Sequence, residues 1–279
     1  MSHQFVRSCV GVAAVVLLST WSAAPNAQRG GGQAPSPPPT ARAAAPMDLT
    51  GNWVSVVTED WHNRMVTPQK GDYESVPLNE EGRRVADTWN LTADNAAGLQ
   101  CKSYGIGNIM RQPGRLRITW ENDDTLKIEF DAGMQTRLLH FGNAGPADRE
   151  ATWQGHSTAA WEMPARGSDN FAGLGDLGRA GDRWVPRGGS LRVSTTGFRA
   201  GYLRTNGVPY SENATITEYF DLVPPLPNGD QWFVVSTTVE DPRYLNEPFL
   251  TSTNFKKEPD GSRWNPTPCR TDPPGVVTR

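Results

Sequence analysis

The segment Thr152–Glu162 contains His156, the side chain of this chain best suited to acid–base chemistry. Aromatic and small residues occupy every second position of the segment: Trp153, Gly155, Ser157, Ala159 and Trp161. Side chains of a strand point to alternate faces, so the segment predicts one strand with an aromatic face and a polar face. An imidazole titrates near neutral pH, so His156 could act as a general acid or base if its face points into a cavity. If that face points to solvent, His156 is an ordinary surface residue.

Two carboxylates are candidates for the partner of His156 in such chemistry. Glu218 shares a predicted strand face with Ile216 and Phe220, and a carboxylate among apolar neighbours either pairs with an arginine or has a raised pKa. Asp241 ends another predicted strand, where Asp is a frequent turn former. Each carboxylate is therefore either a catalytic partner of His156 or a structural residue.

The loop Gly201–Glu212 offers groups that could hold and orient a ligand. Tyr202, Arg204 and Tyr210 could line the mouth of a cavity, where a guanidinium would bind a polar or anionic end of a ligand. The alternative is an ordinary hairpin with bulky residues at its rim.

A further histidine, His140, lies on the strand that precedes Thr152–Glu162 and could be a cross-strand neighbour of His156. We expect His140, Trp153 and Trp161 to contact a ligand. With His62, these histidines could form an open zinc site. However, no His-x-His or His-x-x-x-His spacing is present, so the sequence predicts no metal site.

Composition limits the classes of partner. The chain has 279 residues, is 37% hydrophobic and has a formal net charge of -3, without a run of Lys or Arg. Nucleic-acid binding requires a basic patch, so we expect no nucleic-acid partner. The length suits a single β domain.

The N-terminus resembles a targeting segment. A positive Arg7 precedes the short apolar run Cys9–Leu18, and small residues before Ala27 suggest cleavage there. The apolar run is too short to span a bilayer. We therefore expect a signal peptide at residues 1–27, a disordered linker rich in Pro, Gly and Ala at 28–46, and one folded domain at 47–279. The protein should be exported, to the periplasm or the extracellular space, with no transmembrane segment.

After removal of Cys9 with the signal peptide, Cys101 and Cys269 remain. An even pair of cysteines in an exported chain predicts a disulfide. Two unpaired thiols are the alternative.

Most of the domain shows strand patterns separated by turn signals, with one helix predicted at Asn79–Trp89. Asn79 would cap that helix, and Glu80 and Arg84 would form an ion pair along it. Regular strands without β-α-β alternation indicate an all-β fold, here an antiparallel barrel of about eight to ten strands with one short helix.

The region 164–189 interrupts this rhythm with a glycine-rich loop, which is either a lid over a cavity or a mobile surface insertion. Within it, Gly173-x-Gly175-x-x-Gly178 matches the dinucleotide-binding spacing. No strand is predicted before the motif and no helix after it. The sequence therefore predicts no cofactor.

Several short motifs resemble known proteins. The opening Asp48–Trp53 resembles the Gly-x-Trp motif of lipocalin-like (calycin) barrels. A broader set resembles a largely uncharacterised group of exported bacterial proteins, over about Asp48 to Cys269: Pro77-Leu78, Glu81-Gly82, Cys101 with Gly105, Trp153-x-Gly155-His156-Ser157, Trp161-Glu162, Leu191-x-Val193-x-Thr195-Thr196-x-Phe198, Glu218-Tyr219-Phe220, Asp241-Pro242-x-Tyr244 and Pro248-Phe249. The resemblance implies a lipocalin-like barrel in the cell envelope and no particular reaction.

Three functions fit these observations. The first is binding of a small, largely apolar or amphipathic molecule in the barrel cavity, without catalysis. The second is an enzyme that uses the same cavity for acid–base chemistry such as hydration, elimination or isomerisation, with His156 beside Glu218 or Asp241 and with Tyr202 or Arg204 orienting the substrate. The third is an envelope protein with a filled barrel. The sequence gives no indication of the oligomeric state.

Overall fold

The structure is a computed structural model that describes residues 38–142, 150–163 and 189–271. The helices and strands of these residues belong to the unit that begins at Pro39, ahead of the expected Met47. The strands are β1 (Gly51–Val56), β2 (Arg115–Asn122), β3 (Thr125–Phe130), β4 (Ala132–Gly133), β5 (Thr136–Phe141), β6 (His156–Glu162), β7 (Ser190–Thr196), β8 (Gly201–Tyr202), β9 (Pro209–Tyr210), β10 (Thr215–Val223), β11 (Trp232–Glu240), β12 (Phe249–Glu258) and β13 (Thr267–Pro268). The helices are α1 (Trp61–Arg64), α2 (Glu80–Ala86) and α3 (Leu91–Ala96), with the 3-10 turns η1 (Gln100–Tyr104) and η2 (Ile109–Arg111). The predicted glycine-rich loop lies almost entirely outside the described residues.

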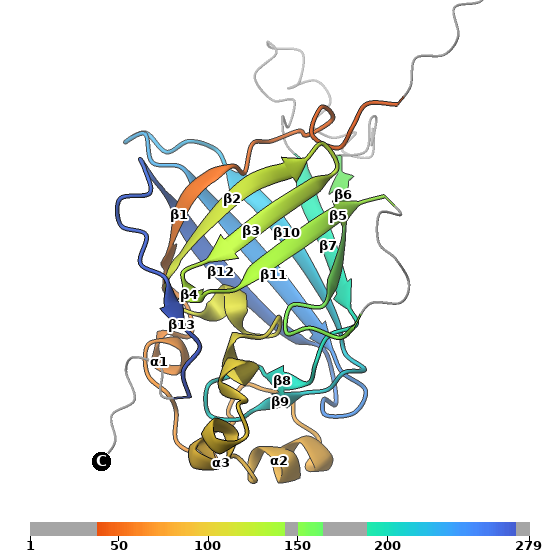
Figure 1. Cartoon of the computed structure of the whole chain (residues 1–279), viewed down its shortest axis with the longest axis vertical. Helices are drawn as coiled ribbons and strands as arrows, with labels where there is room; N and C mark the ends of the chain where they lie inside the picture. The colour runs from red at the N-terminus through yellow and green to blue at the C-terminus, as the bar shows by residue number, and fades with distance from the viewer. Residues whose placement is uncertain (1–37, 143–149, 164–188, 272–279) are drawn as a thin grey trace, which may run out of the picture. The chain divides into compact units, whose positions relative to one another are not determined.

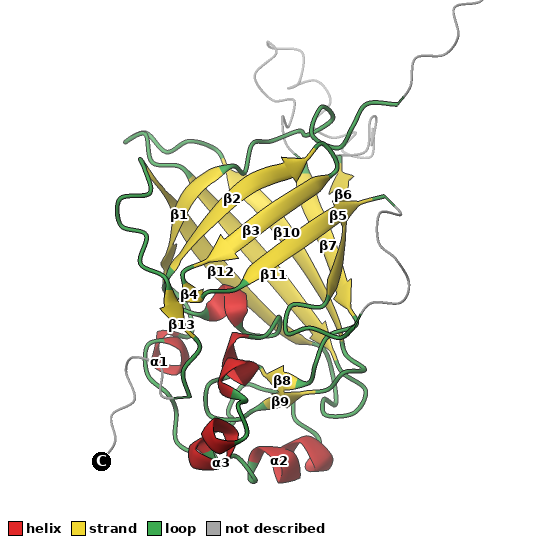
Figure 2. Ribbon diagram, in the orientation of Figure 1, coloured by secondary structure: helices red, strands yellow, loops and turns green. Residues whose placement is uncertain are grey.

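Nine strands form a closed barrel in the order β1-β12-β11-β10-β7-β6-β5-β3-β2 (Figures 1 and 2). The predicted all-β barrel is confirmed. Alternation along the strands accounts for it, because inward residues such as Leu116 and Ile118 of β2 are buried while the alternate residues Arg117 and Thr119 are not. Closure also leaves no unpaired edge in this sheet.

One pair of neighbouring strands departs from the antiparallel arrangement that we expected. β5 and β6 run parallel, with Leu139 beside Ser157 and Phe141 beside Ala159. Parallel neighbours cannot be joined by a tight hairpin, because the chain must return to the end where the first strand began. Alternation within a strand reports which face is buried but not the direction of the neighbour, so the sequence pattern missed this pair.

Large apolar side chains fill most of the barrel interior. The edge of the Trp53 ring meets Phe233 with ring centroids 4.6 Å apart, and Phe255 stacks on Phe233 at 4.8 Å. Trp53, Phe233 and Phe220 have no exposed surface. Barrels of this size are commonly filled by their own side chains, and this one is filled over the region of these rings.

A layer of polar side chains crosses the interior below that aromatic core. On β10, Glu218 lies between Ile216, which belongs to a lower hydrophobic cluster, and Phe220, which belongs to the main one. Arg137 of β5 binds Glu218 through both terminal nitrogens, at 2.5 and 3.2 Å. Both side chains are almost completely buried. The polar layer therefore separates two apolar cores.

The second core lies in a base formed by helices and the small β8–β9 hairpin, beneath the barrel in Figure 1. The predicted helix is present there as α2, and the side chain of Asn79 accepts a hydrogen bond from the Gly82 amide at 2.8 Å. The expected pairing of Glu80 with Arg84 is replaced by Glu81 with Arg84, at 2.6 Å. The base also contains further short helices that the sequence pattern did not reveal.

Cys101 and Cys269 form the predicted disulfide, with Cα atoms 5.0 Å apart and a sequence separation of 168 residues. Next to it, β13 pairs with β4, and the Thr267 amide donates to the Asp131 carbonyl at 2.8 Å. The bond thus fastens the C-terminal segment to η1. Within the described residues, no helix is long and apolar enough to cross a bilayer.

Candidate functional site

Three aromatic rings gather at the end of the barrel opposite the helical base. Trp120 of β2, Phe141 of β5 and Trp161 of β6 form a row, with centroids 5.7 Å apart for Trp120 and Phe141 and 5.2 Å apart for Phe141 and Trp161. Both tryptophans are only partly buried, whereas the rings deeper in the barrel are closed to solvent. This aromatic end, defined as Trp120, Phe141 and Trp161, keeps partial solvent exposure among the described residues.

A short segment before β1 crosses this end of the barrel (Figure 1). The Trp161 indole donates to the Ala41 carbonyl at 2.8 Å, and the Ala41 amide donates to Asp124 at 2.7 Å. Ala41 and Met47 also pack against the main core. The Arg42 amide also donates to the Asp123 carbonyl at 2.9 Å, so the segment is fastened to the β2–β3 turn and to Trp161 while lying outside the barrel wall.

The face of β6 that points inward is the aromatic one. Ser157 and Ala159 are buried, and Trp161 packs against the core. The strict alternation of inward and outward side chains does not extend before His156, because Gly155 has a φ of +63°. This left-handed conformation turns the chain. Gln154 is consequently buried, while Trp153 lies half-buried under the Arg199 guanidinium, 4.2 Å from its ring centroid. Trp161 thus lies at the barrel end and Trp153 does not.

His156 lies on the outer face of the barrel wall. Together with His140, Thr152 and Glu150 it lines a surface cleft of about 340 Å³ between β5 and β6. Both histidines line this cleft, but they are not the cross-strand neighbours that the sequence suggested, because His140 lies opposite Thr158 in the β5–β6 register. The His140 Nδ1 atom lies 3.3 Å from the Thr125 hydroxyl.

The carboxylates proposed as partners of His156 are engaged elsewhere. Glu218 faces the interior and pairs with Arg137, which agrees with the structural alternative for this residue. Asp241 accepts hydrogen bonds from the Ser211 amide at 2.7 Å, the Ser211 hydroxyl at 2.8 Å and the Arg243 amide at 3.0 Å. His156 and Glu218 therefore lie on opposite sides of the wall, and the arrangement that acid–base catalysis in the cavity would require is not formed among the described residues.

The loop residues singled out from the sequence lie in the base rather than at the aromatic end. Tyr202 donates to Asp94 at 2.6 Å, and burial together with this bond raises the pKa of Tyr202. Tyr210 has no exposed surface and meets Phe198 edge-on, and burial raises its pKa too. Arg204 is 1% exposed and donates to the Ser75 hydroxyl at 2.8 Å.

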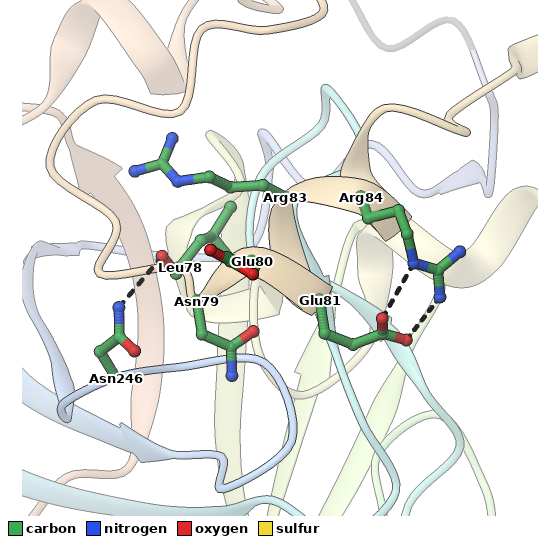
Figure 3. Close-up of a pocket in the computed structure, with 7 residues that line it drawn as sticks. All are labelled: Leu78, Asn79, Glu80, Glu81, Arg83, Arg84 and Asn246. Atoms are coloured by element: carbon green, nitrogen blue, oxygen red, sulfur yellow. Dashed lines mark hydrogen bonds and ion pairs between the residues drawn. The ribbon is translucent and has the colours of Figure 1, made fainter.

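A surface hollow of about 870 Å³ runs along α2 (Figure 3). Its polar groups serve the local structure. Asn79 caps the helix and donates to the Arg243 carbonyl, Asn246 donates to the Leu78 carbonyl at 3.3 Å, and Glu81 holds Arg84. We therefore regard this hollow as a consequence of how α2 is anchored.

Among the residues that the structure describes, no group of three or more His, Cys, Asp or Glu side chains could hold a metal ion. No family model matches the chain, and a search of curated proteins likewise found no match. The function must therefore be argued from the geometry of the site.

Proposed function

We propose that this protein binds one small, largely apolar molecule at the aromatic end of its barrel. The observation that carries the proposal is the row of Trp120, Phe141 and Trp161, whose outer rings stay partly exposed while the interior below them is filled. Aromatic rings offer large apolar surfaces with defined stacking geometry. Small pockets in soluble proteins are typically lined in this way.

The space beside the aromatic end limits the size of the ligand. Ala159 lies next to Trp161 on the inward face of β6 and retains 5% exposure, and Phe141 retains 8%. Deeper entry is blocked by Trp53 and Phe233. The ligand is accordingly a single ring system or a short chain held near the barrel end.

The place of action that we propose is outside the reducing cytosol. The Cys101–Cys269 disulfide supports this, because such bonds persist mainly in oxidising compartments. The targeting-like N-terminus and the motif resemblance to exported lipocalin-like barrels point in the same direction. An exported binding protein for a sparingly soluble molecule is consistent with these features.

Titration with uncharged N-phenyl-1-naphthylamine, whose fluorescence rises in apolar surroundings, tests the proposal directly. The wild-type protein should enhance the emission saturably. The variant Ala159→Phe, which fills the space beside Trp161, should weaken binding of the dye by about tenfold, which corresponds to about 1.4 kcal/mol.

Trp61→Ala is the matched control, because Trp61 is 61% exposed on α1 and lies outside the barrel. Its affinity for the dye should equal that of the wild type. Equal affinity in wild type and Ala159→Phe, or no saturable signal at all, would refute binding at the aromatic end.

A further inference from the structure

Three arginines from distant parts of the sequence converge in the base of the molecule. Arg64 ends α1, Arg111 ends η2, and Arg204 lies in the loop between β8 and β9. Their exposures are 8%, 4% and 1%. Arg64 donates from Nε to the Arg111 carbonyl at 2.9 Å, which joins the first two directly. Buried arginines are uncommon unless each is paired.

The hydrogen-bonding capacity of this arginine cluster, Arg64, Arg111 and Arg204, is only partly used. Besides the bond to the Arg111 carbonyl, each guanidinium has one side-chain partner. These partners are Glu59 for Arg64 at 2.7 Å, Asp60 for Arg111 at 2.9 Å and Ser75 for Arg204 at 2.8 Å.

Five buried nitrogens of the cluster have no hydrogen-bond partner within the described part of the chain: Arg64 Nη2, Arg111 Nε and Nη1, and Arg204 Nε and Nη1. Buried donors are nearly always satisfied in folded proteins, and guanidinium donors point in fixed directions. So many open donors in one cluster indicate that an acceptor group belongs there.

The charges of the cluster are also unbalanced. Two carboxylates contact it, Glu59 and Asp60, and both side chains are partly exposed, at 27% and 36%. Arg204 contacts only a hydroxyl. Arg204 has no direct ion-pair partner among the described residues, and Asp60, Asp72 and Glu74 act on it only from longer range. A buried charge without a direct counter-ion is unfavourable, so a bound anion would supply the contact that Arg204 lacks.

The pKa values of Arg64 and Arg204 also indicate that their charged forms are destabilised by the surroundings. Burial, followed by repulsion from Arg111, lowers the pKa of Arg64 to about 10. Burial and the same neighbour also lower the pKa of Arg204. Arg111 therefore lies within electrostatic reach of both other guanidinium groups, and an anion among the three would offset the effect.

Space for a small group is present beside the cluster. A cavity of about 150 Å³ adjoins the cluster at Arg64, the one arginine of the three that lines it. Thr67, Gln112, Thr205 and Thr267 supply further polar groups, and the remaining lining residues are Met65, Val66, Tyr104, Pro113 and Ala132. Sites for drug-sized ligands have about 300–1,000 Å³. The cavity can thus take a single small oxyanion or the anionic end of a longer molecule.

We propose that Arg64, Arg111 and Arg204 form an oxyanion site that takes a phosphate or a carboxylate group. Planar guanidinium groups bind both groups through paired N–H···O bonds. The site lies in the base, at the opposite end of the barrel from the aromatic end, and does not depend on the function proposed for that end.

Thermal unfolding of the full chain with its disulfide intact, in rising concentrations of sodium phosphate, sodium acetate or sodium chloride at matched ionic strength, tests the site. A ligand that binds only the folded state raises the melting temperature with concentration. Phosphate, acetate or both should raise it beyond chloride already at millimolar concentration and in a saturable way, whereas the general stabilisation by phosphate grows without saturation at high concentration. The salt with the saturable effect identifies which oxyanion the site takes. Equal melting temperatures in all three salts would overturn the proposal.

Two variants locate the effect, measured as affinity by calorimetry with the effective anion. Arg204→Gln should weaken binding by about tenfold or more, the usual effect of losing a charge-assisted hydrogen-bonded contact. Arg84→Gln is the control, because that arginine is exposed and pairs only with Glu81 among the described residues. Unchanged affinity in Arg204→Gln would show that the anion binds elsewhere. If Arg204→Gln does not fold, Arg204→Lys replaces it and should weaken binding, because it keeps the charge but loses the paired donors.

Discussion

At the scale of single residues, the ion pair of Arg137 and Glu218 shows how this barrel tolerates charge in its interior. The Glu218 carboxylate accepts two hydrogen bonds from the Arg137 guanidinium, one from Nη1 and one from Nη2. The Nη2 atom also lies 3.5 Å from the Ser157 hydroxyl oxygen. Ser157 in turn shares a 2.8 Å hydrogen bond with Thr195. The pair is surrounded by hydroxyls on one side and apolar cores above and below, so neither charge can reach water when its partner is removed.

Glu218→Gln should therefore lower the free energy of unfolding by about 3–5 kcal/mol, because it leaves a buried guanidinium without a counter-ion. The measurement is urea denaturation at neutral pH. The double variant Arg137→Met/Glu218→Leu should recover most of the loss, because it removes both charges together.

Glu212→Gln provides the comparison for that experiment, because Glu212 forms an exposed pair with Arg243 at 3.4 Å. Exposed pairs contribute about 0–1 kcal/mol, so its stability should stay close to that of wild type. Equal effects of Glu218→Gln and Glu212→Gln would contradict the account of the interior pair.

At the scale of elements, α2 depends on its capping residue because it has only seven residues and helices of this length are marginal alone. Asn79 accepts from the Gly82 amide and donates to the Arg243 carbonyl at 2.9 Å, so it joins the helix to the loop after β11. Gly82 lies under Tyr244, whose carbonyl would be 2.5 Å from an added Cβ. The cap and this close approach together fix the helix against the barrel.

Asn79→Ala should lower the free energy of unfolding by about 0.5–2 kcal/mol. Asn79→Asp should lose less, because its carboxylate can still accept from the Gly82 amide but cannot donate to Arg243. Chemical denaturation of both variants checks the order. An Asn79→Ala protein as stable as wild type would show that the cap is dispensable.

The elements also show what the sequence could predict. The strands, the helix cap and the burial of Glu218 followed from local patterns, since each depends on residues close together in the chain. The parallel β5–β6 pair did not, because alternation along a strand reports which face is buried and not the direction of the neighbouring strand. The position of His156 could not be predicted from the sequence either. Which face of β6 points inward depends on its neighbours, and these place Ser157 inside and His156 outside.

The arginine cluster could not be predicted from the sequence. The sequence marks Arg204 as a loop residue that could bind a ligand. Arg64 and Arg111 each lie in a short helix whose sequence carries no sign of a binding site. An arginine in a helix is usually solvated. Only the folding of three separate segments into one base brings these side chains together.

At the scale of the whole molecule, the disulfide holds the C-terminal segment against the base. Cys269 lies near the Gly133 carbonyl, and Gln135 donates to that carbonyl at 2.7 Å. Apart from β13, the segment after β12 makes no further strand pairing in the described residues. Its attachment therefore depends strongly on the covalent bond.

Replacement of both cysteines, Cys101→Ser/Cys269→Ser, should lower the free energy of unfolding by about 2–5 kcal/mol, chiefly by enlarging the ensemble of the unfolded chain. Thermal and urea unfolding check this. Dithiothreitol should destabilise the wild type to a similar level and leave the double variant unchanged. A reductant effect on the double variant would point to a cause other than this bond.

The barrel closes through its first strand, because β1 pairs with β2 on one side and with β12 on the other, where Trp53 lies opposite Lys257. A chain that leaves the ribosome N-terminus first therefore makes β1 long before the strand that completes its pairing. Such non-local pairing slows folding and leaves an open sheet edge in the meantime. A nascent chain that ends before Phe249 lacks β12 entirely, so the native barrel can form only after nearly all of the chain has been synthesised.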